Sequence, residues 1–206
     1  MFAVGHMALA YLLSKAASKL LKVKINIPLI LVLSIIPDID IILNFLFNIQ
    51  IHRGPTHSLI TATLVFIPFF IIYRWKAVPY FTALASHAAI ADFIIGGQLQ
   101  LLWPLSTREF GFPYIDITNP VNVALEFTLF VIATIIMWKT RDLFQFFRNS
   151  KLNLILAIPI FTVLLPTFTS YPLSVPLLLV LPHLFYLILF IISVLIALKG
   201  IVQRSG

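Results

Sequence analysis

Most of the histidines and acids in this 206-residue chain occur in short motifs within or beside long apolar segments. The side chains with potential chemistry are His6, Asp38, Asp40, His52, Arg53, His57, His87, Asp92 and Glu126. Imidazole nitrogens and carboxylate oxygens together suit Zn²⁺, Mn²⁺ or Fe²⁺. Because the chain has no cysteine, thiolate ligands and disulfides are excluded. The residue types therefore predict a divalent-metal site built from nitrogen and oxygen ligands.

The candidate residues divide by expected role. The predicted metal ligands are His6, Asp38, His52, His57, His87 and Asp92. They exceed the four ligands of one tetrahedral site, so we expect one or two ions, with zinc favoured over manganese or iron. Asp40, Arg53 and Glu126 are assigned to catalysis: a spare carboxylate can orient a histidine or act as general base, and an arginine can bind phosphate through two donors.

Two spacings constrain the helices that carry these residues. Asp38 and Asp40 are two apart, so on an ideal helix they point in nearly opposite directions. Either Pro37 disrupts the helix, or one acid is a ligand and the other supports it. His87 and Asp92 are five apart, which does not place them on one face of an α-helix, so a local distortion or separate roles are required.

Each motif also has a purely structural interpretation. The two acids near Pro37 could cap a kinked helix, and the segment 52–57 could be a polar turn around Gly54 and Pro55. His6 could cap a terminus, and Glu126 could pair with Arg108. His183, beside Pro182 in an apolar segment, is interpreted as a packed helix histidine and is not included in the site.

The composition indicates that lipid solvates most of the chain. Hydrophobic residues make up 61% and charged residues 10% of it, against about half and a quarter in soluble domains. The apolar segments are 2–20, 27–48, 58–74, 77–96, 121–138, 152–170 and 174–198. They predict an all-α, polytopic transmembrane bundle of about seven spans, or six if helix 2–20 is interfacial. Residues 1–206 form one integral membrane domain, with the metal motifs within 1–126 and apolar C-terminal helices at 152–198.

The basic residues predict how the chain crosses the membrane. With seven spans, twelve of the fourteen fall on one side, and Arg53 and Arg108 remain opposite. We therefore attribute the net charge of +7 to basic residues that orient the chain in the membrane, and no nucleic acid is expected as a partner. We expect an inner or plasma membrane protein without a signal peptide, with its C-terminus cytoplasmic and its site facing outward. The irregular stretch 97–120 lies on the outer side, where it could cover the site.

The ordered motifs resemble a known family. They are Gly5-His6, Pro37-Asp38-Ile39-Asp40, His52-Arg53-Gly54-Pro55-Thr56-His57-Ser58, Ser86-His87 followed by Asp92, and Leu101-Leu102-Trp103-Pro104. This set resembles the LexA-regulated inner-membrane proteins described as metal-dependent hydrolases, over residues 1 to about 126. The resemblance implies hydrolysis more firmly than it implies a substrate. Members often carry Thr before the first histidine, where this chain has Gly5.

Three functions are compatible with the motifs. The favoured one is hydrolysis, by metal-activated water, of a phosphoester in a phospholipid or lipid-linked substrate, because the predicted site lies near the outer headgroups. The second is transport of metal ions or protons, for which polar residues on both sides of mid-membrane would be expected. The third is an intramembrane metalloprotease, although His-Glu-x-x-His is absent. The substrate and the oligomeric state are left open.

Overall fold

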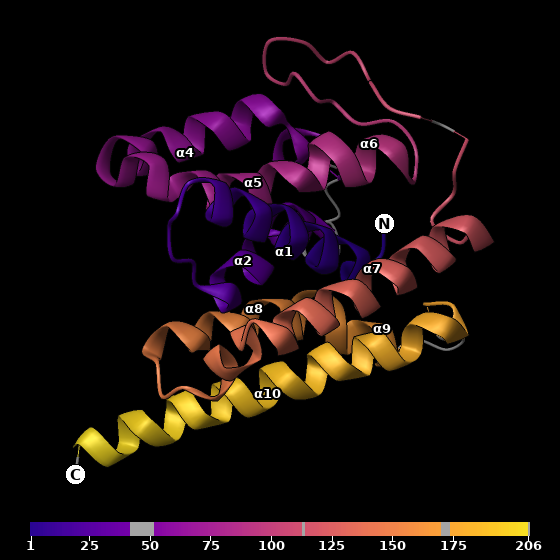
Figure 1. The fold of residues 1–206 in the computed structure, drawn as a ribbon. Coiled ribbons are helices and arrows are strands. Elements are labelled where there is room, and N and C mark those ends of the chain that lie inside the picture. The colour runs from indigo at the N-terminus through magenta and orange to yellow at the C-terminus, as the bar shows by residue number, and fades with distance from the viewer. Residues whose placement is uncertain (42–51, 113, 170–173, 206) are drawn as a thin grey trace.

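The computed structural model describes residues 1–41, 52–112, 114–169 and 174–205. Within these residues it is helical, and the only β-type pairing is an isolated bridge between Leu99 and Phe110. The long helices run alongside one another in a bundle (Figure 1). The predicted all-α class of membrane helical protein is thus confirmed.

Helix α1 (Ala3–Leu20) lies in the middle of the bundle. It packs against α2 (Ile27–Leu33), α5 (Val78–Ser86) and α7 (Pro120–Lys139). Many of its small and apolar side chains are fully buried, among them Val4, Met7 and Ala8, while Leu20 at its end is exposed. The segment 2–20 therefore forms the predicted helix, and protein rather than lipid covers most of its surface.

Four stretches among the described residues are long and apolar enough to cross a membrane. They are Leu59–Ile94, Pro120–Lys139, Lys151–Thr169 and Leu177–Gln203. The first is broken at Arg74, whose φ of 48° ends α4 (Leu59–Tyr73) and leads through the 3₁₀ turn η3 (Arg74–Ala77) into α5, which lies beside α4. The segment predicted at 27–48 lies partly outside the described residues, so the number of seven spans stays a prediction.

The C-terminal third forms one side of the bundle. After the 3₁₀ turns η5 (Asp142–Phe147) and η6 (Lys151–Leu156), the chain continues as α8 (Ala157–Pro159), the π-helical segment η7 (Ile160–Leu164) and α9 (Leu165–Thr169). Pro166 cannot donate the hydrogen bond that an α-helix would direct to Thr162, which favours a distortion here. The long helix α10 (Leu177–Ser205) then packs against α7 and η6.

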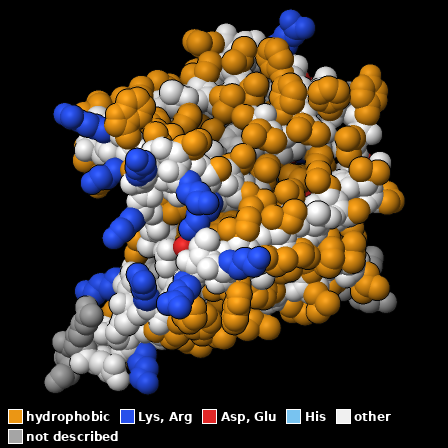
Figure 2. Space-filling view, viewed as in Figure 1, with side chains coloured by type: hydrophobic (Ala, Val, Ile, Leu, Met, Phe, Trp, Pro, Cys, Tyr) orange, Lys and Arg blue, Asp and Glu red, His pale blue; other side chains and the backbone are white. Residues whose placement is uncertain are grey.

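The surface divides into an apolar belt and a basic end. Large apolar side chains are exposed on α4, α7 and α10, including Ile71 at 72%, Val121 at 71% and Leu181 at 74%. Figure 2 shows most of the visible Lys and Arg side chains gathered at the end where the C-terminus lies. The α1–α2, α4–α5 and α7–η5 connections all reach this end (Figure 1). Basic residues thus gather at one end of the bundle on the face shown, and the orientation of the chain in the membrane stays a prediction.

Candidate metal centre

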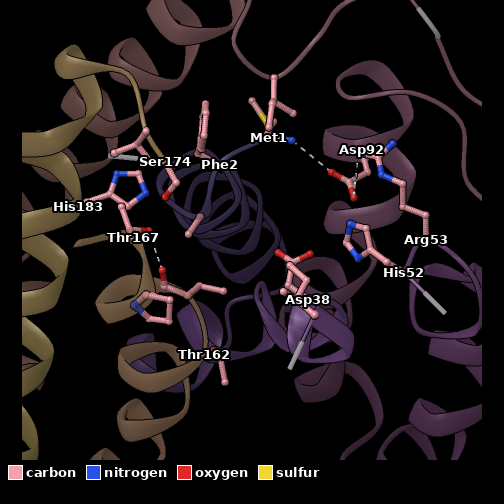
Figure 3. A pocket seen from close by; sticks show the side chains of 16 residues that line it. Met1, Phe2, Asp38, His52, Arg53, Asp92, Thr162, Thr167, Ser174 and His183 are labelled. Atoms are coloured by element: carbon pink, nitrogen blue, oxygen red, sulfur yellow. Dashed lines mark hydrogen bonds and ion pairs between the residues drawn. The ribbon is translucent and has the colours of Figure 1, made fainter. Parts of the chain in front are cut away.

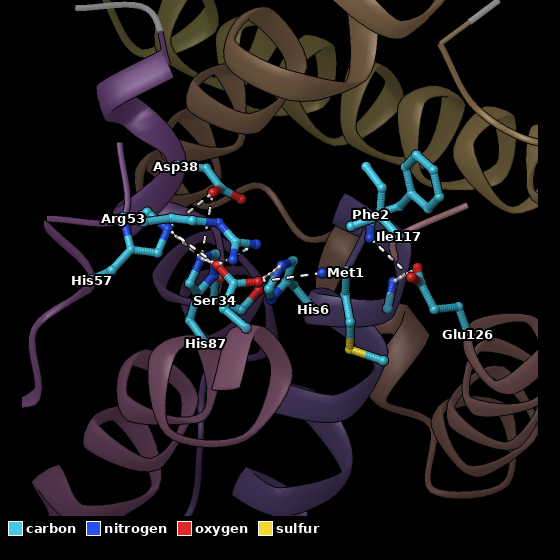
Figure 4. Close-up of polar contacts among 12 residues, drawn as sticks. Met1, Phe2, His6, Ser34, Asp38, Arg53, His57, His87, Ile117 and Glu126 are labelled. Atoms are coloured by element: carbon cyan, nitrogen blue, oxygen red, sulfur yellow. Dashed lines mark hydrogen bonds and ion pairs between the residues drawn. The ribbon is translucent and has the colours of Figure 1, made fainter. Parts of the chain in front are cut away.

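Four side chains from separate parts of the chain direct one atom each at a common point. The atoms are Asp38 Oδ1, His57 Nε2, His87 Nε2 and Asp92 Oδ2, and all four residues are buried. The two imidazole nitrogens are 3.2 Å apart. Asp38 Oδ1 lies 3.4 Å from each of them, and Asp92 Oδ2 lies 3.3 and 3.5 Å from them. Figure 4 shows Asp38, His57 and His87 of this group beside Met1 and His6 at the start of α1.

The spacing of this quartet fits a small divalent cation. Five of the six distances among these atoms are 3.2–3.5 Å, and the two carboxylate oxygens lie within 4.8 Å of each other. In a regular tetrahedron with edges of about 3.4 Å the corners lie about 2.1 Å from the centre, and zinc binds histidine nitrogen and carboxylate oxygen at about 2.0–2.2 Å. Two carboxylates would also balance the two positive charges of the ion. These residues could therefore hold a metal ion, as the sequence predicts.

The other nitrogen of each histidine fixes the protonation of the ring. His87 Nδ1 lies 2.6 Å from the backbone oxygen of Ser34, which can only accept, so Nδ1 carries the proton. His57 Nδ1 lies 3.4 Å from Asp40 Oδ2 and 3.0 Å from Thr56 Oγ1. In the neutral rings both Nε2 atoms are then acceptors. In that state the four facing atoms are all acceptors and would repel one another, and either a bound metal ion or a proton on an imidazole removes the repulsion.

A π-helical segment brings His87 and Asp92 to the same side of their helix. Residues His87–Ala91 form the π-helical segment η4, and the N–H of Asp92 donates to the carbonyl of His87. A turn of this width places residues five apart on the same face, which resolves the predicted spacing problem. The short helix α6 (Asp92–Ile94) follows.

Asp38 and Asp40 are separated by the ring of His57. The 3₁₀ turn η1 (Ile36–Ile39) contains Pro37 and Asp38, as expected for a disrupted helix. Asp38 faces Nε2 and Asp40 faces Nδ1 of the same imidazole. Asp38 is thus a ligand candidate, whereas Asp40 supports the ring from behind.

His52 contacts Asp40 instead of the quartet. Its Nδ1 lies 2.9 Å from Asp40 Oδ1, and Thr56 Oγ1 donates to Asp40 Oδ2. Asp40, His52 and His57 form a second group with ligand atoms within 4.8 Å of one another. This group shares His57 with the quartet, and one imidazole seldom serves two ions. We therefore interpret the group as a hydrogen-bonded support in which Asp40 orients both rings.

His6 and Arg53 lie beside the quartet, and both contact Asp92. The His6 ring stacks on that of His87 with centroids 3.9 Å apart, and its Nε2 lies 3.4 Å from Asp92 Oδ1, the oxygen outside the quartet. Arg53 Nη2 lies 3.9 Å from Asp92 Oδ2. The Arg53 side chain packs against Gly96, where a Cβ would come within 2.4 Å of Nη2. His6, predicted as a ligand, lies outside the quartet and holds Asp92 from the side.

Glu126 binds the start of α1. It accepts hydrogen bonds from the backbone N–H of Phe2 at 2.9 Å and of Gly5 at 3.1 Å, and from Asn122 Nδ2 at 2.8 Å. Such N–H groups have no partner within a helix, and a carboxylate there is favoured. The predicted catalytic role gains no support from these contacts. A Cβ on Gly5 would lie 2.6 Å from Glu126 Oε2, which explains the absence of Thr at this position.

A cavity of about 490 Å³ opens beside the quartet. Asp38, His52, Arg53 and Asp92 line one side of it, and residues of η7, α9 and α10 line the other (Figure 3). His183 belongs to this second side, and its Nδ1 donates to the Leu179 carbonyl at 2.8 Å. It is packed, as interpreted from the sequence, but it also faces the cavity. The cost of a polar group within an apolar span could have indicated this.

The segment 97–120 reaches the same cavity. The N–H of Gly96 donates to the carbonyl of Ile115 at 2.7 Å, and Ile117 lines the cavity. Leu59 and Ser58, at the start of α4, hydrogen-bond to the carbonyl of Leu101. The irregular stretch therefore covers one side of the site, as the sequence predicts.

Comparison with known proteins agrees with the membrane fold. No curated protein and no solved structure gives a significant match to the chain. A match to one family extends over residues 1–173, beyond the region of about 126 residues that the motifs suggest, and so includes the cavity wall formed by η7 and α9. Since the match covers most of the sequence, the chain belongs to the YdjM inner membrane protein family.

Proposed function

We propose that this protein is a membrane-embedded, metal-dependent hydrolase that cleaves a phosphoester of a phospholipid or lipid-linked molecule. The observation that carries the proposal is the convergence of two imidazole nitrogens and two carboxylate oxygens, with the nitrogens 3.2 Å apart and each oxygen 3.3–3.5 Å from both, beside an accessible cavity. A bound divalent ion would supply Lewis acidity and a water activated near neutral pH.

The protein's own side chains would position the substrate. Arg53 lines the cavity next to Asp92, where its guanidinium can bind phosphate oxygens. The side chain of His52 is 35% exposed and also lines the cavity, so it can hold a proton near the leaving group. Asp40 fixes the orientations of His52 and His57.

The opposite wall suits an apolar tail. Phe2, Val163, Pro166 and Val175 give this wall apolar surface away from Arg53 and the acids, and Thr162, Thr167, Ser174 and His183 are the polar residues among them. A ligand with a phosphate at one end and acyl chains at the other would match both sides. This contrast within one cavity favours a lipid over a water-soluble phosphoester.

The proposed site faces outward. The end of the bundle with the basic connections lies away from α6 and the start of α7, near which the quartet lies (Figure 1). The positive-inside rule places the basic end, with the C-terminus, in the cytoplasm. The cavity would then open toward the outer leaflet, where phospholipid headgroups are available.

Metal analysis and hydrolysis, measured on the same samples, test the proposal. Wild type, Asp38→Ala and His57→Ala would be analysed for bound metal and for cleavage of phospholipids and generic phosphoesters. Asp116→Ala, which removes an exposed acid, is the matched control. We expect both ligand variants to lose metal and hydrolysis together, and the control to keep both. Hydrolysis that survives chelation and both changes would overturn the mechanism, whereas bound metal without any hydrolysis by wild type would favour transport.

Filling the apolar wall tests the substrate class. Val175→Trp would occupy space where an acyl chain is proposed, while Val131→Trp adds the same bulk on the exposed face of α7. We expect Val175→Trp to lower lipid hydrolysis by about tenfold or more, because overpacking blocks the tail. Cleavage of p-nitrophenyl phosphate should be retained. Equal losses on both substrates would contradict a lipid-binding wall.

A further inference from the structure

A second cavity, of about 580 Å³, lies at the basic end of the bundle. Its wall is formed by Lys15, Ser18, Val23, Lys24, Ile25, Asn26, Tyr80, Asp142, Gln145 and Arg148. These residues come from the end of α1, the α1–α2 connection, α5 and η5, so several separate elements enclose it. The metal quartet and Arg53 take no part in this cavity.

The charges in this cavity leave an excess of cations. The Asp142 carboxylate is buried and already accepts hydrogen bonds from Tyr11 at 2.8 Å, Thr140 at 2.7 Å and Lys15 at 2.5 Å. Asp142 is the one acid in the wall, and Lys15 balances it. Within the described part of the chain, no carboxylate lies within ion-pair distance of Lys24 or Arg148. Two cationic side chains therefore remain to attract an anion.

The surrounding surface places this cavity at headgroup depth. Exposed aromatic side chains adjoin basic residues here: Trp75 is 72% exposed next to Lys76, and Trp138 is 71% exposed next to Lys139. Phe147, which precedes Arg148, is 49% exposed. Aromatic residues concentrate at the boundary between hydrocarbon and headgroups, and lysines and arginines gather on the cytoplasmic side. An anion at this depth is most readily supplied by a lipid.

We propose that this cavity binds the phosphate of an anionic phospholipid headgroup in the leaflet opposite the metal centre. Lys24 and Arg148 would contact the phosphate, and the polar side chains of Asn26 and Gln145 border the space for the rest of the headgroup. Basic pockets between transmembrane helices on the cytoplasmic side bind such headgroups in other proteins. The proposal does not depend on hydrolysis at the other end.

Lipid retention tests this site. Purified protein would be exchanged into detergent with phosphatidylglycerol or phosphatidylcholine, and bound lipid counted by native mass spectrometry. The test variant is Lys24→Gln with Arg148→Gln. The matched control, Lys76→Gln with Lys139→Gln, removes the same charge at the same end without altering the cavity wall. All four side chains are exposed, so folding should be unaffected, which a thermal melt would verify.

We expect phosphatidylglycerol to be retained by wild type and by the control. The cavity variant should bind it on the order of thirtyfold more weakly, because each cation near an anionic headgroup contributes about fivefold. Equal losses in the two variants, or equal retention of phosphatidylcholine, would overturn the site. Complete displacement by millimolar inorganic phosphate would show a free-phosphate site and would overturn the lipid assignment.

Discussion

Buried acids near the two ends of α1 differ in what surrounds their oxygens. Near the C-terminal end, Asp142 receives three donors, from Tyr11, Lys15 and Thr140. Near the N-terminal end, Asp38 and Asp92 face two imidazole nitrogens, which are acceptors in the neutral rings, and Asp92 is also 3.3 Å from the amino group of Met1 and 3.9 Å from Arg53. A buried carboxylate with donors is stable by itself, whereas acceptors that converge need a positive charge between them, which a metal ion or protonated imidazoles can supply. Burial and acidity alone therefore do not mark a candidate metal site, and the balance of donors and acceptors around the carboxylates is the better guide.

The same substitution at the two clusters should give opposite results for metal. Asp92→Ala removes a quartet oxygen, and we expect metal affinity to fall by more than about 100-fold, since loss of an outer partner alone costs 10–100-fold. Asp142→Ala should leave metal content unchanged. Elemental analysis after dialysis against a weak chelator measures both. Retention of metal by Asp92→Ala, or its loss from Asp142→Ala, would remove the distinction.

Asp40 should have an intermediate effect, because it orients a ligand without belonging to the quartet. Asp40→Asn keeps the size of the side chain but weakens the contact with His57 Nδ1. We expect metal affinity to fall by about 10–100-fold, with the metal-to-protein ratio unchanged at saturation. Competition with a chromophoric chelator gives the affinity. A reduced ratio at saturation would instead show that Asp40 holds a second ion.

At the other cluster the effect should be on stability. Asp142→Ala removes the acceptor 2.8 Å from the Tyr11 hydroxyl and the ion-pair partner of Lys15. We expect a loss of about 2 kcal/mol in the free energy of unfolding, the usual scale for hydrogen bonds to a charged group. Thermal denaturation in detergent, compared with Asp116→Ala on the surface, would detect it. An unchanged melting temperature would mean that the three donors do not stabilise the fold.

The smallest effect is expected at Glu126, which, like Asp142, is a buried carboxylate that accepts hydrogen bonds from several donors. Gly5→Ala would place a Cβ 2.6 Å from Glu126 Oε2. The flexible carboxylate can move partly aside, so we expect a destabilisation of about 1 kcal/mol with metal retained. Combining it with Glu126→Asp should restore part of the stability by shortening the side chain. Loss of metal from Gly5→Ala would assign Glu126 to the centre after all.

The sequence predicts most of the helices and the four converging residues, because apolar length and the cost of buried charge are local properties. It does not separate ligands from their supports. The sequence does not distinguish His6, His52 and His57 from one another. The fold shows that, of these three, only His57 directs a nitrogen into the quartet. The π-helical segment at His87 is implied by the five-residue spacing to Asp92, but its form depends on packing.

The cavity could be predicted only in part. Its polar side follows from the motifs around Asp38 and Arg53. Its apolar side comes from η7, α9 and α10, whose uniformly apolar sequence does not indicate which face meets the site. His183 is an example, because its neighbours along the chain suggest packing while its position across the bundle places it on the cavity wall.

X-ray absorption of the zinc-loaded protein tests the central claim most directly. We expect one ion per chain, bound at about 2.0–2.2 Å by two histidine nitrogens and by oxygens, those of Asp38 and Asp92 and that of the water to be activated. That signal should disappear in His57→Ala and persist in Asp142→Ala. A first shell without histidine, or an unchanged spectrum in His57→Ala, would contradict a metal centre formed by Asp38, His57, His87 and Asp92.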